Sequence, residues 1–198
     1  MAARFEPTPS PLFQEVVNVI VGMSWRPELS VEEIPAPAKI APFSVAISAE
    51  VEVGGDDVGS GRLVLLHDPA GSSAWEGDFR CVTYARAEVD AEMAIDPLVT
   101  EVGWSWLMDA LDRNHADYVA PSGTVTTVAS RSFGGIATDG LRAAIALRPS
   151  RTPVPPRAED LARHLESWAE LVCQTAGLPP LPEGVVPLAS RRAGSWLR

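Results

Sequence analysis

The segment that most constrains the fold is residues 43–53, FSVAISAEVEV, in which apolar residues recur at every second position. This period of two is typical of a β-strand with one face on a core and the other toward solvent. Two loops rich in glycine and aspartate, residues 54–61 and 68–77, then lead into the apolar segments 62–67 and 78–89. Because glycine, proline and aspartate favour chain reversal, the sequence predicts three consecutive antiparallel strands.

Three helices and two further strands complete the predicted elements. The pairs Ser10-Pro11 and Asp96-Pro97 each combine a capping side chain with a proline suited to the first helical turn. A third helix is expected over residues 158–176, with Gly177 just beyond its end. Residues 122–133 and 140–149 are expected to form two strands joined by a short loop.

The predicted order is therefore α-βββ-α-ββ-α. Runs of hairpins with interspersed helices favour an α+β fold, with a two-layer architecture, an antiparallel five-stranded sheet and helices mainly on one face. The order is similar to the topology of the type III secretion chaperones, a likeness that implies no function without a matching site. We expect a flexible arm at residues 1–9, one domain over 10–178, and an extended or disordered tail at 179–198.

Composition argues against several kinds of partner. The chain has 198 residues, of which 16 are basic and 26 acidic, and its formal charge of −10 disfavours binding to nucleic acid or an anionic membrane. The two cysteines, Cys81 and Cys173, lack metal-ligand spacing, and we expect them to be reduced core thiols. The N-terminus has no apolar run of the signal-peptide type, so a soluble, cytoplasmic protein is expected.

Several segments carry a family resemblance, namely RLVLLHDP, WEGDFR, DPLVTEVGWSWLMDAL, SGTVT with the following SFGG, and AGLPP. Over about residues 10–188 the chain resembles an actinobacterial domain of unknown function, number three thousand in its series. The resemblance implies no activity, and it transfers no catalytic residue to this sequence.

His67 and Asp68 are the strongest candidates for catalysis. Adjacent histidine and aspartate ligate metals in phosphohydrolases, but that chemistry needs further converging ligands, and the other histidines are only His115 and His164. We interpret His67 as a strand-terminal residue and Asp68 as a cap of the following turn. The alternative is an enzyme in which Asp68 orients His67 as a general base beside the loop of Trp75. No metal or cofactor is expected.

The outer face of the sheet is the candidate binding surface. Successive side chains of a strand point to opposite faces of the sheet. In the third predicted strand Arg80, Tyr84 and Arg86 therefore point away from the core, and in the fifth Arg142 and Arg148 do the same. Two interpretations are open: a face that only solubilises the chain, and a docking surface for an acidic protein partner or an anionic ligand, because guanidinium groups match carboxylates and phosphates.

Trp75 lies in the loop before the third predicted strand, where it either covers the open end of the core or forms a second contact, because aromatic residues in exposed loops are common binding anchors. The sequence favours an intracellular, non-enzymatic binding or adaptor protein. A small-molecule binder with a pocket between sheet and helices is a further alternative.

The segment 98–111 predicts a helix that is apolar around most of its circumference. Such a helix needs cover on more than one side. If Trp104, Leu107, Met108 or Leu111 remained exposed, the patch would meet its own copy in a symmetric homodimer. The homodimer and full burial within one chain are the two expectations for this helix.

Overall fold

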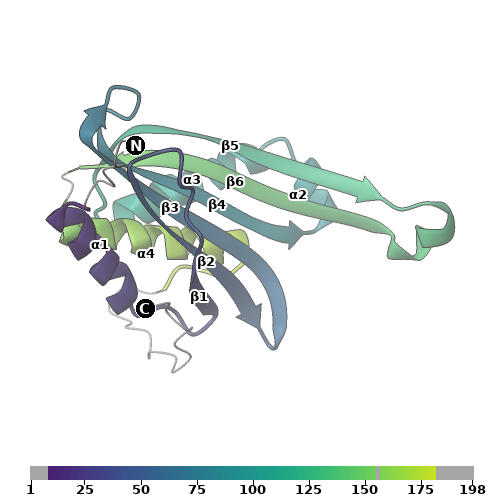
Figure 1. Cartoon of the computed structure of the whole chain (residues 1–198). Coiled ribbons are helices and arrows are strands. Elements are labelled where there is room, and N and C mark those ends of the chain that lie inside the picture. The colour runs from purple at the N-terminus through teal and green to yellow at the C-terminus, as the bar shows by residue number, and fades with distance from the viewer. Residues whose placement is uncertain (1–8, 155–156, 182–198) are drawn as a thin grey trace, which may run out of the picture.

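A computed structural model describes residues 9–154 and 157–181. In this part of the chain one six-stranded antiparallel sheet has the order β1-β2-β3-β4-β6-β5 (Figure 1). The strands are β1 (Leu29–Ile34), β2 (Phe43–Val53), β3 (Asp56–Ser72), β4 (Gly77–Val89), β5 (Tyr118–Arg131) and β6 (Leu141–Pro153). The helices are α1 (Pro11–Gly22), α2 (Ala91–Ile95), α3 (Val99–Arg113) and α4 (Ala158–Thr175), with a 3-10 turn η1 (Gly134–Asp139) between β5 and β6.

The α+β class and the antiparallel sheet are confirmed, but the five-stranded sheet and the order α-βββ-α-ββ-α are wrong in detail. The missed strand is β1, in which Leu29 and Val31 are buried opposite Val51 and Ala49 of β2. Its sequence, LSVEEI, is too short and too acidic to show a period of two. The additional strand sets the fold apart from the five-stranded topology of the secretion chaperones.

The second helix also begins later than predicted. Asp96 does not cap a helix, because its Oδ1 accepts a hydrogen bond from the backbone N–H of Leu98 at 2.8 Å and so closes a turn. The short helix α2 precedes this turn, and α3 begins at Val99. By contrast, Ser10 caps α1 as predicted, since its Oγ accepts from the N–H of Phe13 at 3.1 Å.

Helix α4 lies across one face of the sheet, where it contacts β2, β3, β4 and β6, and it also contacts α1 and α3 (Figure 1). Trp168 of α4 and Phe79 and Ile145 of the sheet are fully buried between these layers. The helix approaches β3 closely at Gly61, where an added Cβ would lie 2.3 Å from Val172 Cγ2. Close packing of this face leaves the opposite face of the sheet as the open face, on which the candidate surface lies.

Most of the apolar surface of α3 is covered within the same chain. Leu107 and Leu111 are fully buried, whereas Trp104 and Met108 are half-buried against the core. The broad exposed patch on which the predicted dimer through residues 98–111 depended is therefore reduced to the two flanks of the helix, with Trp104 and Met108 on one and Val102 and Trp106 on the other.

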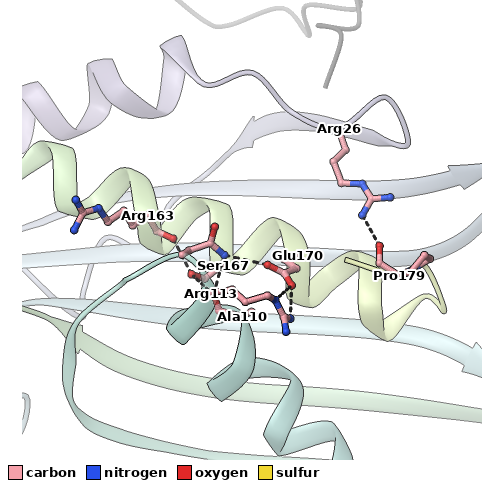
Figure 2. Close-up of polar contacts among 8 residues, drawn as sticks. Arg26, Ala110, Arg113, Arg163, Ser167, Glu170 and Pro179 are labelled. Atoms are coloured by element: carbon pink, nitrogen blue, oxygen red, sulfur yellow. Dashed lines mark hydrogen bonds and ion pairs between the residues drawn. The ribbon is translucent and has the colours of Figure 1, made fainter. Parts of the chain in front are cut away.

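The contact between α3 and α4 includes polar bonds, one buried and one nearer the surface (Figure 2). The hydroxyl of Ser167 donates to the carbonyl oxygen of Ala110 at 3.2 Å, and the guanidinium of Arg113 forms an ion pair with Glu170. These contacts fix α3 against α4 and hold it beneath β5 and β6.

The end of the described chain is also fixed. Arg26 donates to the carbonyl oxygen of Pro179 at 3.0 Å, which joins the segment after α4 to the segment before β1 (Figure 2). The predicted tail falls mainly on residues 182–198, and most of the predicted arm falls on residues 1–8; both ranges lie outside the described residues. Of the helices in the described ranges, none has the length and apolar character needed to cross a membrane.

Candidate functional site

The imidazole of His67 belongs to the core. It is 2% exposed, and its ring is stacked on Phe79 with the centroids 4.1 Å apart. Nδ1 lies 3.2 Å from the carbonyl oxygen of Asp78, which only accepts, so Nδ1 carries the proton. Nε2 then accepts from the hydroxyl of Ser10 at 3.0 Å. Both ring nitrogens are engaged in hydrogen bonds between elements of the fold.

Asp68 does not orient this imidazole. Its Oδ1 accepts from the backbone N–H of Ala70 at 3.0 Å, which is the geometry of a side chain closing its own turn. Successive residues of a strand point to opposite faces, and Asp68 and His67 share no hydrogen bond in the described residues. The two residues of the alternative general-base site are therefore not brought together.

Arg80 is buried rather than displayed on the open face. It is 7% exposed, and its Nη1 donates to the carbonyl oxygen of Ala120 at 2.8 Å and to Thr152 Oγ1 at 3.2 Å. Its Nη2 donates to Ser122 Oγ at 2.9 Å and to Ser150 Oγ at 2.7 Å. Burial lowers the pKa of this guanidinium, which nevertheless stays protonated at neutral pH. Arg80 thus joins β4, β5 and β6 and leaves the candidate contact surface.

Trp75 is tied to the same cluster. Its carbonyl oxygen accepts from the hydroxyl of Thr152, so the turn between β3 and β4 is held against β6. The side chain of Trp75 is half-buried. Its position is compatible with a covering role or with a contact role, and its use in binding stays a prediction.

A second buried arginine lies on the helix-facing side of the sheet. Arg151 is fully buried; its Nε donates to His164 Nδ1 at 3.1 Å and its Nη2 to the carbonyl oxygen of His164 at 3.0 Å. His164 Nε2 in turn donates to the carbonyl oxygen of Asp117 at 3.1 Å. Burial, followed by the charge of Arg151, lowers the pKa of His164 to about 3. Because this imidazole stays neutral at physiological pH, it serves as a neutral link between α4 and the sheet.

Three exposed arginines of the open face surround a half-buried tyrosine, and we call this group the arginine face: Arg62 (β3), Tyr84 and Arg86 (β4) and Arg148 (β6). Arg62 lies directly opposite Tyr84, and the guanidinium carbon of Arg148 lies 5.2 Å from the centre of the Tyr84 ring. Arg62, Arg86 and Arg148 are exposed, and none of the three forms an ion pair with a carboxylate in the described ranges. The arrangement presents cations on three neighbouring strands.

Acidic side chains occupy the neighbouring part of the open face. Glu50 of β2 lies opposite Ser60, and Glu32 of β1 lies opposite Ser48. Partial burial raises the pKa of Glu50, as do the nearby charges of Asp57 and Glu32, whereas the charge of Arg62 acts in the opposite direction. Carboxylates thus predominate on β1 and β2, whereas Arg62, Arg86 and Arg148 lie on β3, β4 and β6, with exposed Glu88 two residues beyond Arg86 on β4.

The structure sorts the predicted contact residues into separate places. Tyr84, Arg86 and Arg148 lie together on the open face, whereas Arg142 lies further along β6 and is 4.0 Å from Glu88. Arg62 is the member of the group that the sequence analysis missed. The signal was present, because Leu63, Leu65 and His67 alternate onto the core side and so place Arg62 on the open face.

Metal chemistry finds no support in the described ranges, where no three His, Cys, Asp or Glu side chains are grouped to hold a metal ion. No match was found among curated proteins or among solved structures. The family model described as "Protein of unknown function (DUF3000)" matches residues 9–186, which is most of the chain and includes both the arginine face and the core around His67. This chain therefore belongs to the DUF3000 family.

Proposed function

We propose that this chain is a non-enzymatic binding or adaptor protein whose arginine face receives an acidic segment of a protein partner. The observation that carries the proposal is the row of Arg62, Tyr84 and Arg148, in which two exposed guanidinium groups flank an aromatic ring on adjacent strands. Arginine presents several donors in a planar fork that matches carboxylates, and the tyrosine adds apolar contact area.

The acidic character of the whole chain does not prevent such binding. The formal charge is −10, but exposed charges separated by more than a Debye length of about 8 Å are largely screened at physiological salt. Contact distances are shorter than this length, so the local cations of the arginine face determine the short-range interaction. Glu32 and Glu50 would keep an acidic partner off β1 and β2, and Glu88 would limit how far it extends along β4 beyond Arg86.

The test uses two fluorescent peptides, ten glutamates and ten lysines, titrated with the full chain and followed by anisotropy. We expect the glutamate peptide to bind and the lysine peptide not to bind, with affinity falling as salt increases, because exposed charge pairs are screened. The triple variant Arg62→Glu, Arg86→Glu, Arg148→Glu should lose the binding.

A matched variant controls for net charge. Lys39, Arg131 and Arg142 are also exposed and lie outside the arginine face, and their replacement by glutamate changes the charge of the chain by the same amount while it breaks only one long ion pair between exposed groups. This control should keep most of the binding. Absence of binding to the glutamate peptide, or equal losses in both triple variants with folding intact by circular dichroism, would refute the proposal.

A further inference from the structure

The two edges of the sheet differ in how far they are protected from pairing with another strand. Edge strand β1 is six residues long, contains Glu32 and Glu33, and is followed by Pro35. Short length, charge and proline are the usual means of blocking an edge. Edge strand β5 is 14 residues long, and residues 122–130, SGTVTTVAS, contain no charge and no proline. In the described part of the chain, β5 pairs only with β6.

The irregular start of β5 does not close this edge. The register between β5 and β6 shifts between Val119 and Ser122, and Ala120 has a φ of 48°, so the bulge is confined to the first residues of the strand. Arg80 fixes this bulge through its bonds to the Ala120 carbonyl and Ser122. From Ser122 onward the pairing with β6 is regular, and the outer side of the strand presents backbone donors and acceptors to an incoming strand. Figure 1 shows β5 at the outer margin of the sheet, along the projecting β5–β6 hairpin.

Helix α3 lies directly beneath this edge. A Cβ on Gly103 would lie 3.1 Å from Val125 of β5 and 3.4 Å from Ile145 of β6, so α3 lies under both strands. The flank of α3 toward the edge carries Trp104, whose ring would be 3.0 Å from a Cβ on Gly123, and Met108, which accepts a hydrogen bond from the Tyr118 hydroxyl. Both side chains are half-buried.

The free edge of β5 and the adjacent flank of α3 could each meet the same surface of a second copy, related by a two-fold axis perpendicular to the sheet. Strands joined edge to edge lie about 4.8 Å apart, so an α3 under β5 and β6 and its symmetry mate would be roughly 10 Å apart, which is a helix-packing distance. The half-buried Trp104 and Met108 would then meet their counterparts and enlarge a contact that two strand edges alone make small.

The charges at the two ends of β5 favour the same arrangement. Exposed Asp117 immediately precedes the strand, and the end of the strand carries exposed Arg131, which has no ion pair among the described residues. Antiparallel pairing of β5 with a second β5 brings the acidic start of each strand toward the basic end of the other. Between these ends the strand is uncharged, so like charges do not oppose each other along the pairing.

From these observations we infer that β5 is a homodimerisation edge, and that a second copy of this chain adds its own β5 in antiparallel orientation to give a continuous sheet of two subunits. The inference goes beyond the arginine face and does not depend on it. Because the two-fold axis is perpendicular to the sheet, both arginine faces would point to the same side of the dimer.

The test is sedimentation velocity of the full chain from about 1 to 100 µM, a range that spans typical dissociation constants of modest interfaces. Wild type is expected to dimerise. Thr126, exposed near the middle of the free edge, is replaced by lysine or by glutamate, which brings like charges together near the axis. Each variant should raise the dimer dissociation constant at least about fivefold. An equimolar mixture of the lysine and glutamate variants should recover dimerisation, because opposite charges then face each other.

Ser30, exposed on the other edge strand, provides the matched control. Ser30→Lys and Ser30→Glu should leave dimerisation unchanged. Wild type that stays monomeric throughout the range overturns the inference, as does a dimer that tolerates both Thr126 variants or that is lost equally in the Ser30 variants. A dimer lost in both Thr126 variants and not recovered on mixing also overturns it, since pairing of β5 with β5 requires recovery.

Discussion

Removal of the His164 imidazole should make the protein less sensitive to mild acid. In the folded chain, burial and the adjacent Arg151 lower the pKa of His164 from 6.5 to about 3. Between these two values the unfolded chain binds a proton that the folded chain does not bind, so acid favours unfolding. The contribution of this group to stability is therefore complete above about pH 6.5 and is lost progressively as the pH falls toward 3.

The magnitude follows from the two pKa values. With 6.5 for the unfolded state and about 3 for the folded state, lowering the pH from about 7.5 to about 5 protonates His164 only in the unfolded chain. The expected loss in the free energy of unfolding is about 2 kcal/mol, with a limiting slope of about 1.4 kcal/mol per pH unit. This window lies above the usual pKa range of most carboxyl groups, so their protonation contributes less to the change.

The assay is urea unfolding of wild type and His164→Gln at several pH values in this window. The glutamine side chain offers a hydrogen-bond acceptor and a donor, but it does not titrate. Between about pH 7.5 and about pH 5 the free energy of unfolding of His164→Gln should therefore fall by about 2 kcal/mol less than that of wild type. His115→Asn is the control, because it removes an exposed histidine at a φ of 52° that asparagine tolerates, and its pH dependence should follow that of wild type. Equal losses in wild type and His164→Gln would refute the reasoning.

Three further changes test the packing by chemical denaturation. Gly61→Ala should lower stability by about 1–3 kcal/mol, because its Cβ would lie 2.3 Å from Val172, whereas Gly22→Ala, with nothing within 4 Å, should not. Ser10→Ala should cost about 1–2 kcal/mol, since the hydroxyl both caps α1 and binds His67; a loss below about 0.5 kcal/mol would show that neither bond contributes. His67→Ala should cost about 3 kcal/mol through loss of a buried stacked ring, and a change below about 1 kcal/mol would contradict the core role.

The strands of the sheet centre were predictable because one face of each is buried. Residues 43–53 of β2 and 78–89 of β4 alternate clearly, and their boundaries agree with the structure to within one residue. Strand β1 was not predictable, since its six residues are stabilised mainly by pairing with β2. The end of β6 was placed too early because SRTP resembles a linker, and Arg151 within it was not expected in the core.

The candidate site was predictable in its general position but not in its members. Alternation indicated which side of the sheet Arg80 and Arg148 occupy, but it gave no information about burial. Arg80 is buried because Ser122 and Ser150, which lie 42 and 70 residues away in sequence, supply hydroxyl acceptors. A set of acceptors assembled from two other strands, β5 and β6, has no local sequence signal, so the distinction between an anchoring and an exposed arginine required the tertiary structure.

The two proposed surfaces are geometrically compatible, and this compatibility has a consequence for binding. The arginine face uses side chains perpendicular to the sheet, whereas pairing of β5 uses backbone groups in the plane of the sheet, so one contact does not block the other. In the dimer the two arginine faces lie on the same side, which would make the assembly bivalent. A short acidic peptide reaches one face and should bind monomer and dimer with equal affinity. A partner with two acidic segments should bind the dimer more tightly, because the second contact is intramolecular. The two proposals can therefore fail separately: peptide binding tests the arginine face, and the Thr126 variants test the edge.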